Sequence, residues 1–309
     1  MNQSTPFGAG STADQVLAGI DLSGKCFVVT GCNSGIGFET VNALAANGAH
    51  VIGLARSLAA AESACKRVGP ACSPVACDLS DLESVAGAAA AIRARNTPVD
   101  GIVANAGIAN FPSLRTRYGV EMQFLVNHLG HFALVNALCD RVRDGTGRIV
   151  VVSSNASITH APAEGIMFDN LDGRRSYAPG AFYGQSKLAN ALYAKELSRR
   201  LNGRGIAVNS VHPGATRGTG INRHQKQSWV RSVAALFMRN AQRGAATQAL
   251  LAASTRVAGI SGEYWTDCRI ADGHPLLGDI ELAKRLWEVS DRIVAAQTGP
   301  ADKRLQAAA

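Results

Sequence analysis

The sequence contains no long apolar run and no concentrated basic segment. None of its 309 residues lies in an apolar stretch of about 18 residues, which a membrane-spanning helix requires, and no basic segment followed by an apolar run opens the chain. The net charge is +8, yet the lysines and arginines are scattered in runs no longer than two, so nucleic-acid binding is not expected. We therefore expect a soluble, cytoplasmic protein without a transmembrane segment.

Disulfide and metal patterns are missing as well. The seven cysteines are odd in number and irregularly spaced, which is more typical of reduced thiols in a cytosol than of a disulfide framework. His128 and His131 lie three residues apart, but no HExxH motif and no Cys/His cluster accompanies them. Packing within a helix is therefore favoured over metal binding for this pair, and we predict no metal site.

The chain does contain an alternation of short apolar runs and helical patterns. Each apolar run is brief and continuous, as in a parallel strand that is covered on both faces. Strands that alternate with helices form right-handed crossover units, so the sequence predicts an α/β fold. We expect a single-domain Rossmann fold, a doubly wound parallel sheet of about seven strands with helices on both faces. The predicted strands span residues 25–30, 50–55, 73–76, 101–104, 148–153 and 206–211, and the predicted helices include 58–68, 81–94, 118–142 and 181–201.

The domain is expected to span residues 23–297, between an N-terminal extension (1–22) and a C-terminal tail (298–309). The extension begins with polar and small residues and then contains one short helical pattern, for which Ser11 is the predicted N-cap. No second domain and no internal repeat beyond the strand–helix rhythm is expected.

Residues 215–242 are expected to form a lid over the substrate. Their apolar side chains recur in an amphipathic pattern that includes Trp229, Val233, Leu236 and Phe237. As a lid, this segment would cover a lipophilic substrate. A surface helix that packs on the sheet fits the same pattern equally well.

A glycine-rich loop follows the first predicted strand directly. The sequence after Thr30 is GCNSGIG, and a helical pattern begins at its end. Gly31, Gly35 and Gly37 leave the backbone bare, so that a pyrophosphate can approach the helix N-terminus, where free N–H groups favour anions. A dinucleotide-binding loop is therefore predicted here.

The end of the second strand indicates which dinucleotide binds. Acidic residues at this place hydrogen-bond the ribose hydroxyls of NAD, whereas an arginine suits the 2′-phosphate of NADP. This chain has neutral Ala55 followed by Arg56. NADP(H) is therefore favoured over NAD(H). The alternative is that Arg56 is a surface arginine after a strand, with no role in cofactor binding.

Tyr183 and Lys187 lie four residues apart, on one face of the predicted helix 181–201. A free phenol loses its proton only at a pH of about 10. A neighbouring ammonium favours the phenolate and should lower the pKa of Tyr183, so that the pair can exchange a proton with an alcohol or a ketone. By itself the pair is weak evidence, because Tyr and Lys at this spacing are common on solvated faces.

Taken together, the motifs resemble those of the short-chain dehydrogenase/reductase family over about residues 20–295. Further phrases, such as YGQSKLANALYAKEL, are similar to the branch that contains retinol dehydrogenases, the WW-domain-containing oxidoreductase and protochlorophyllide reductases. Cys32 departs from the alanine or serine that the family usually has, and residues 155–180 are lengthened as in this branch. The motifs, in order, are TGCNSGIG (30–37), Asp78-Leu79, Asn105-Ala106-Gly107, Asn127, Ser154, Tyr183-x-x-x-Lys187 and Pro213-Gly214.

The resemblance implies a role for each matching residue. Tyr183 is the acid or base, Lys187 lowers its pKa and holds the nicotinamide ribose, Ser154 donates a hydrogen bond to the substrate oxygen, and Asn127 anchors a proton-relaying water. The alternative for Asn127 is an amide bonded to neighbouring backbone inside its helix. Cofactor contacts are implied for Gly31, Asn33, Ser34, Gly35, Ile36, Gly37, Arg56, Asp78, Leu79, Asn105, Ala106, Gly107, Tyr183, Lys187, Pro213, Gly214 and Thr216.

The predicted function is that of an NADP(H)-dependent oxidoreductase that interconverts a ketone or aldehyde and an alcohol on a lipophilic or bulky small molecule. Reduction of an activated C=C bond is an alternative, because Tyr183 can protonate carbon as well as oxygen. A catalytically quiet protein that binds a nucleotide or a partner is the other alternative. Homodimeric and homotetrameric assemblies both fit the sequence.

Overall fold

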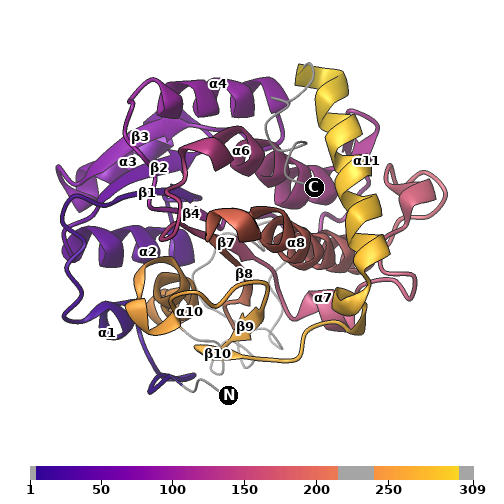
Figure 1. Cartoon of the computed structure of the whole chain (residues 1–309). Helices are drawn as coiled ribbons and strands as arrows, with labels where there is room; N and C mark the ends of the chain where they lie inside the picture. Colours follow the sequence, from indigo (N-terminus) through magenta and orange to yellow (C-terminus); the bar gives the residue numbers. More distant parts are fainter. Residues whose placement is uncertain (1–4, 215–239, 299–309) are drawn as a thin grey trace, which may run out of the picture.

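A computed structural model describes residues 5–214 and 240–298. In this part of the chain, eight strands form one sheet in the order β10-β9-β8-β7-β4-β1-β2-β3, and β5 and β6 form a separate pair (Figure 1). The pairs from β3 to β9 are parallel, and only β10 runs antiparallel to its neighbour. The strands are β1 (Cys26–Thr30), β2 (His50–Ala55), β3 (Cys72–Ala76), β4 (Gly101–Ala104), β7 (Arg148–Val152), β8 (Ala207–His212), β9 (Tyr264–Thr266) and β10 (Arg269–Ile270).

Helices cover both faces of this sheet, as predicted for a doubly wound fold (Figure 1). One face carries α4 (Leu82–Arg93), α6 (Gly130–Leu138), α8 (Pro179–Leu201) and α11 (Ile280–Thr298). The other carries α1 (Ala13–Leu17), α2 (Gly35–Ala46), α3 (Leu58–Val68) and α10 (Ala241–Ala253). The small helices α5 (Met122–Phe124) and α7 (Ala156–Thr159) lie before α6 and α8. Within the described residues, no helix combines the length and the apolarity needed to cross a bilayer.

The predicted helix 118–142 is wrong at its start. Tyr118 and Gly119 both have positive φ values (56° and 71°) and form a tight turn between β5 (Thr116–Arg117) and β6 (Val120–Glu121). The helix begins only after this hairpin, where the Glu121 carboxylate accepts hydrogen bonds from the first-turn N–H groups. It then passes through a π-helical segment, Leu125–Leu129, before α6.

The first helix begins one residue later than expected. Its N-cap is Thr12 rather than Ser11, because Thr12 and Gln15 have the spacing of a capping box and bond reciprocally. Val16 and Leu17 on α1 are buried in the core cluster shared with α2 and α10. The hydroxyl of Thr5 donates to the Cys268 carbonyl, 2.8 Å away, so this segment is also tied to the end of the sheet.

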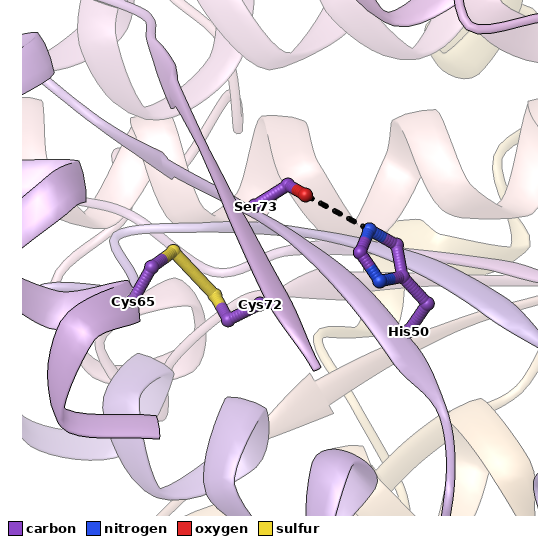
Figure 2. The surroundings of a disulfide bond; sticks show 4 residues. All are labelled: His50, Cys65, Cys72 and Ser73. Carbon is purple, nitrogen blue, oxygen red and sulfur yellow. Dashed lines mark hydrogen bonds between the residues drawn. A yellow bond between two sulfur atoms is a disulfide. The ribbon is translucent and has the colours of Figure 1, made fainter. Parts of the chain in front are cut away.

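Cys65 and Cys72 form a disulfide between the end of α3 and the start of β3 (Figure 2). The chain reverses between them at Gly69, whose φ is 98°. The prediction of reduced thiols is therefore wrong for this pair, because the turn brings two cysteines together that belong to no spaced framework. The remaining cysteines, at positions 26, 32, 77, 139 and 268, are buried thiols.

Candidate active site

A cavity of about 900 Å³ runs along the carboxyl ends of β1, β2, β4 and β7. This is the edge of an open α/β sheet at which ligands bind. Gly35 and Asn127 do not line the cavity, whereas Thr216 and the predicted lid residues Trp229, Val233, Leu236 and Phe237 lie outside the described residues. Its walls include Gly31, Asn33, Ser34, Ile36, Gly37, Arg56, Asp78, Leu79, Asn105, Ala106, Gly107, Ser154, Tyr183, Lys187, Pro213 and Gly214.

The glycine loop forms one end of this cavity. Gly31 and Gly35 have positive φ values of 73° and 58°, which other residues rarely adopt. The helix α2 begins at Gly35, and its N-cap Ser34 makes no side-chain capping bond, so the first-turn N–H groups are left for a ligand. A bare loop that ends in an uncapped helix N-terminus fits the pyrophosphate of a dinucleotide.

Thr30 ties this loop to the neighbouring strand. Its Oγ1 accepts hydrogen bonds from the N–H groups of Asn105 (2.9 Å) and Ala106 (3.0 Å), and the Asn105 amide donates to the Thr30 carbonyl. The Thr30 hydroxyl also pairs with His131 Nε2 at 2.9 Å. Since two N–H groups already occupy the oxygen, the hydroxyl proton is directed at His131.

His131 therefore supports the glycine loop through Thr30, a role that the sequence did not reveal. Its Nδ1 lies 2.9 Å from the Asn127 carbonyl, so Nδ1 carries the proton and Nε2 accepts from Thr30. Burial lowers the pKa of His131 to about 4, which keeps the ring neutral. A threonine directly before the first loop glycine was the only local signal for this network.

Arg56 lies at the end of β2, at the part of the wall that also contains Asp78. Among residues 5–214 and 240–298, no acidic side chain forms an ion pair with Arg56. The Asp78 carboxylate instead accepts from the N–H and hydroxyl of Ser80 (2.9 and 2.7 Å). The exposed guanidinium is therefore available to an anionic group in the cavity.

Asn127 joins the loop after β4 to α8. Its Oδ1 accepts from the Ile108 N–H at 2.8 Å, and its Nδ2 donates to the Ile108 carbonyl and to Ser186 Oγ, both at 2.9 Å. The amide is fully buried in the π-helical segment and bonds residues distant in the sequence, not its own helix. Asn127 thus fixes the wall behind Gly107, where a Cβ would lie 3.2 Å from its Oδ1.

Ser154 and Tyr183 lie together at the other end of the cavity. A hydrogen bond from Ser154 lowers the pKa of Tyr183, but burial raises it more, so the net shift is upward. The neighbouring Ser153 is buried and donates to the Lys187 carbonyl at 2.7 Å. Both serines line the cavity, but the Ser153 hydroxyl is bonded to the Lys187 carbonyl, whereas the Ser154 hydroxyl bonds Tyr183.

The expected effect of Lys187 on Tyr183 is wrong in this structure. Lys187 Nζ lies 6.0 Å from the centre of the Tyr183 ring and donates to the Val152 carbonyl at 3.0 Å. Burial lowers the pKa of Lys187 itself to about 8. Desolvation, which spacing along a helix does not reveal, is thus the largest cause of both pKa shifts.

Curated relatives match most of the chain. Short-chain dehydrogenase TIC 32 B, chloroplastic, of Brassica napus is 35% identical over 303 residues, which cover 93% of this chain and 94% of the relative. The WW domain-containing oxidoreductase of Homo sapiens is 36% identical over 309 residues, which cover 95% of this chain and 73% of the relative. Retinol dehydrogenase 14 of Homo sapiens is 36% identical over 297 residues, which cover 88% of this chain and 87% of the relative.

Solved structures share the fold. An uncharacterized protein from Mycobacterium Paratuberculosis superposes with a TM-score of 0.70 at 28% identity, over 94% of this chain and 98% of that chain. A short chain dehydrogenase from Burkholderia cenocepacia J2315 in complex with NADP superposes with a TM-score of 0.63 at 26% identity, over 80% of this chain and 97% of that chain. A family model described as short chain dehydrogenase matches residues 25–167. Because relatives that are 35% and 36% identical match most of this chain, the chain belongs to the short-chain dehydrogenase family of oxidoreductases.

Proposed function

We propose that this protein uses NADP(H) to interconvert a ketone or aldehyde and an alcohol, with Tyr183 as the acid–base group. The observation that carries the proposal is a single cavity that joins the glycine loop to the hydrogen-bonded Ser154–Tyr183 pair. A cofactor whose pyrophosphate occupies the loop end would extend toward this pair along one continuous wall. The reaction then needs only a carbonyl group beside Tyr183.

The residues at the Tyr183 end manage one proton. A bound nicotinamide would supply or accept the hydride. The Ser154 hydroxyl would donate a hydrogen bond to the substrate oxygen, where negative charge develops during carbonyl reduction. Tyr183 would then give that oxygen its phenolic proton. Because burial raises the pKa of Tyr183, the phenol holds its proton at neutral pH, which is the form that an acid in carbonyl reduction needs.

A preference for NADP(H) rests on Arg56. Its guanidinium is exposed at the cavity wall, and Ala55 before it offers no acid to hydrogen-bond the ribose or repel a phosphate. The NADP complex of the Burkholderia cenocepacia dehydrogenase, a distant neighbour, supports the same choice. The 2′-phosphate would therefore meet Arg56 in this chain.

A lipophilic substrate is the class that we assign. The described cavity wall contributes apolar side chains from Ile108, Phe111 and Met122. Two of the matching curated relatives, retinol dehydrogenases 13 and 14 of Homo sapiens, are named for an apolar alcohol.

The proposal is tested by turnover on a panel of ketones, aldehydes and alcohols that spans small polar and bulky apolar molecules. NADPH oxidation or NADP⁺ reduction is followed at 340 nm, with NADH and NAD⁺ in parallel. We expect turnover of bulky apolar carbonyls with NADPH. Tight NADPH binding without turnover of any panel member would contradict the enzymatic proposal and favour a binding role.

A further inference from the structure

One backbone carbonyl behind the candidate active site receives two side-chain donors. The Val152 oxygen, at the end of β7, accepts a hydrogen bond from Lys187 Nζ and another from Asn190 Nδ2, each at 3.0 Å. Lys187 and Asn190 lie one turn apart on α8, and both are almost fully buried (2% and 1% exposed). A carbonyl oxygen has two lone pairs, so these two donors occupy it completely.

Two further buried polar residues, His128 and Ser290, lie near the Asn190 amide. Burial lowers the pKa of His128, and the Asn190 side chain opposes this fall, so the two groups are close neighbours. Asn190 Oδ1 and His128 Nδ1 are both buried and make no hydrogen bond among the described residues. The other ring nitrogen of His128, Nε2, lies 2.8 Å from the hydroxyl of Ser290 on α11.

Lys187 also lines the cavity, on the side away from Asn190. An ammonium carries three N–H donors, and Val152 takes only one of them. Nζ lies 3.3 Å from the place that a Cβ at Gly107 would occupy, at the wall of the cavity. The remaining donors are therefore directed toward the cofactor side, provided that Val152 does not draw the ammonium inward.

We propose that Asn190 is a positioning residue, which shares the Val152 carbonyl with Lys187 and so keeps the ammonium at the cavity wall, while the neighbouring His128 and Ser290 limit the movement of the amide. The proposal rests on the proposed role of Lys187 at the cofactor. Without the Asn190 amide, the whole carbonyl would be open to Lys187, and the ammonium would be bound more tightly and farther from the cavity.

Several titratable groups lie around Lys187, so the test needs a variant that removes the lysine. Tyr183 lies on the same helix, His128 and His131 are buried near it, and His160 and His212 line the same cavity. Burial lowers the pKa of His128 to about 3 and of His131 to about 4, so both rings stay neutral above pH 6. The pKa of Tyr183 is raised, and that of Lys187 is about 8, so an ionisation near pH 8 reports on Lys187.

The test is the pH dependence of NADPH affinity, measured by fluorescence titration of the full-length protein from pH 6.5 to 10. In the wild type, the dissociation constant should rise with pH through a midpoint near 8, and this midpoint should be absent from Lys187→Met. In Asn190→Ala the midpoint should move up by about half a pH unit, because the ammonium gains the whole Val152 carbonyl. At pH 7, the affinity of Asn190→Ala should fall several-fold, since the ammonium is drawn from the wall.

Two further variants make the result specific. Asn136→Ala removes a partly buried amide on α6, which accepts a hydrogen bond from Tyr193 rather than donating to Val152. This variant should keep the wild-type midpoint. Ser290→Ala removes the hydrogen bond to His128 and so gives the Asn190 amide more freedom. It should shift the midpoint in the same direction by a smaller amount, and it replaces Asn190→Ala if that variant does not fold.

An unchanged midpoint in both Asn190→Ala and Ser290→Ala would overturn the proposal, as would a midpoint that survives in Lys187→Met. No carbonyl substrate is used, so a protein inactive on every ketone still gives a clear answer here. A shifted midpoint without any turnover would therefore support the positioning role and contradict only the proposed reaction.

Discussion

Gly37 packs directly against the carbonyl oxygen of Gly31. A Cβ at position 37 would lie 2.2 Å from that oxygen and 2.5 Å from Nδ2 of Asn105, both far inside van der Waals contact. The first turn of α2 is thereby pressed onto the end of β1, with no room for any side chain. The position of the helix N-terminus in the cavity depends on this contact.

Gly37→Ala should therefore damage the cofactor site. The added methyl group has to push the helix away from the loop, and we expect NADPH affinity to fall by at least tenfold, about 1.4 kcal/mol. Fluorescence titration measures the affinity. Gly87→Ala is the matched control, because a Cβ at this α4 position meets no atom within 4 Å. That variant should bind normally and gain up to about 1 kcal/mol of stability. Equal affinities in the two variants would contradict the role of the close contact.

Tyr183→Phe should abolish turnover and leave NADPH binding within a few-fold of the wild type. The ring still packs, but the transferable proton is gone, and acid–base catalysis of this kind contributes about 10²- to 10⁴-fold. Steady-state assays at 340 nm and a binding titration measure the two effects separately. Tyr118→Phe, which removes a phenol bonded to Asp81 in the β5–β6 turn region, should keep its activity. A Tyr183→Phe enzyme with near wild-type kcat would show that another group supplies the proton.

Arg56→Ala should remove the preference for the phosphorylated cofactor. In the wild type we expect NADPH to bind at least tenfold more tightly than NADH, a difference of about 1.4 kcal/mol. The variant should lose most of that difference through weaker NADPH binding, with little change for NADH, as calorimetric titration would show. Lys66→Ala, at the far end of α3, serves as the charge-matched control. Equal wild-type affinities for the two cofactors would be incompatible with this role.

Glu121 should make folding stability depend on pH. Its carboxyl accepts from the N–H groups of Gln123 and Phe124 and from the Gln123 side chain and Tyr177, yet burial raises its pKa to about 7. A raised native pKa means that stability is fully present below the unfolded value of about 4.5 and is lost as the pH rises through 7.

Between pH 4.5 and pH 8, this loss should amount to roughly 2–3 kcal/mol in the wild type relative to Glu121→Gln. Urea unfolding of both proteins at several pH values measures it, since only the difference between them isolates Glu121. The exposed Glu164→Gln should follow the wild type throughout. A constant difference between wild type and Glu121→Gln at all pH values would show that folding does not raise the pKa of this carboxyl.

The Cys65–Cys72 disulfide should contribute a modest part of the stability. It closes a short loop, with seven residues of separation, for which the loss of unfolded-chain entropy corresponds to about 2 kcal/mol. Dithiothreitol should lower the unfolding free energy of the wild type by this amount and leave Cys72→Ala unchanged. Alkylation of the unfolded, unreduced protein should modify five of the seven cysteines. Modification of all seven would disprove the bond.

The fold was largely predictable, because its signals are local. The helix Leu58–Val68 has the predicted bounds, since Ser57 caps its start and Gly69 ends it. The helix predicted from Tyr118 failed because a non-glycine residue in a left-handed conformation gives no sign in the sequence. Strands β9 and β10 were not assigned individually, because they are only three and two residues long.

The candidate site was predictable in composition and less so in its electrostatics. The spacing of Tyr183 and Lys187 identified them, but their pKa shifts arise from burial by distant elements. The bond between Thr30 and His131 joins residues 101 positions apart, so no local pattern could reveal it. Contacts of this kind, made only when the sheet is complete, are the part of the site that required the structure.

The contact between α1 and α10 has a consequence for the order of assembly in the cell. These helices lie far apart in the sequence, and Thr5 is bonded to a carbonyl 263 residues away. At ordinary rates of translation, α1 leaves the ribosome roughly ten seconds or more before α10 exists. Throughout that time Val16 and Leu17 lack part of the surface that buries them, so α1 reaches its final place only after most of the domain has been synthesised.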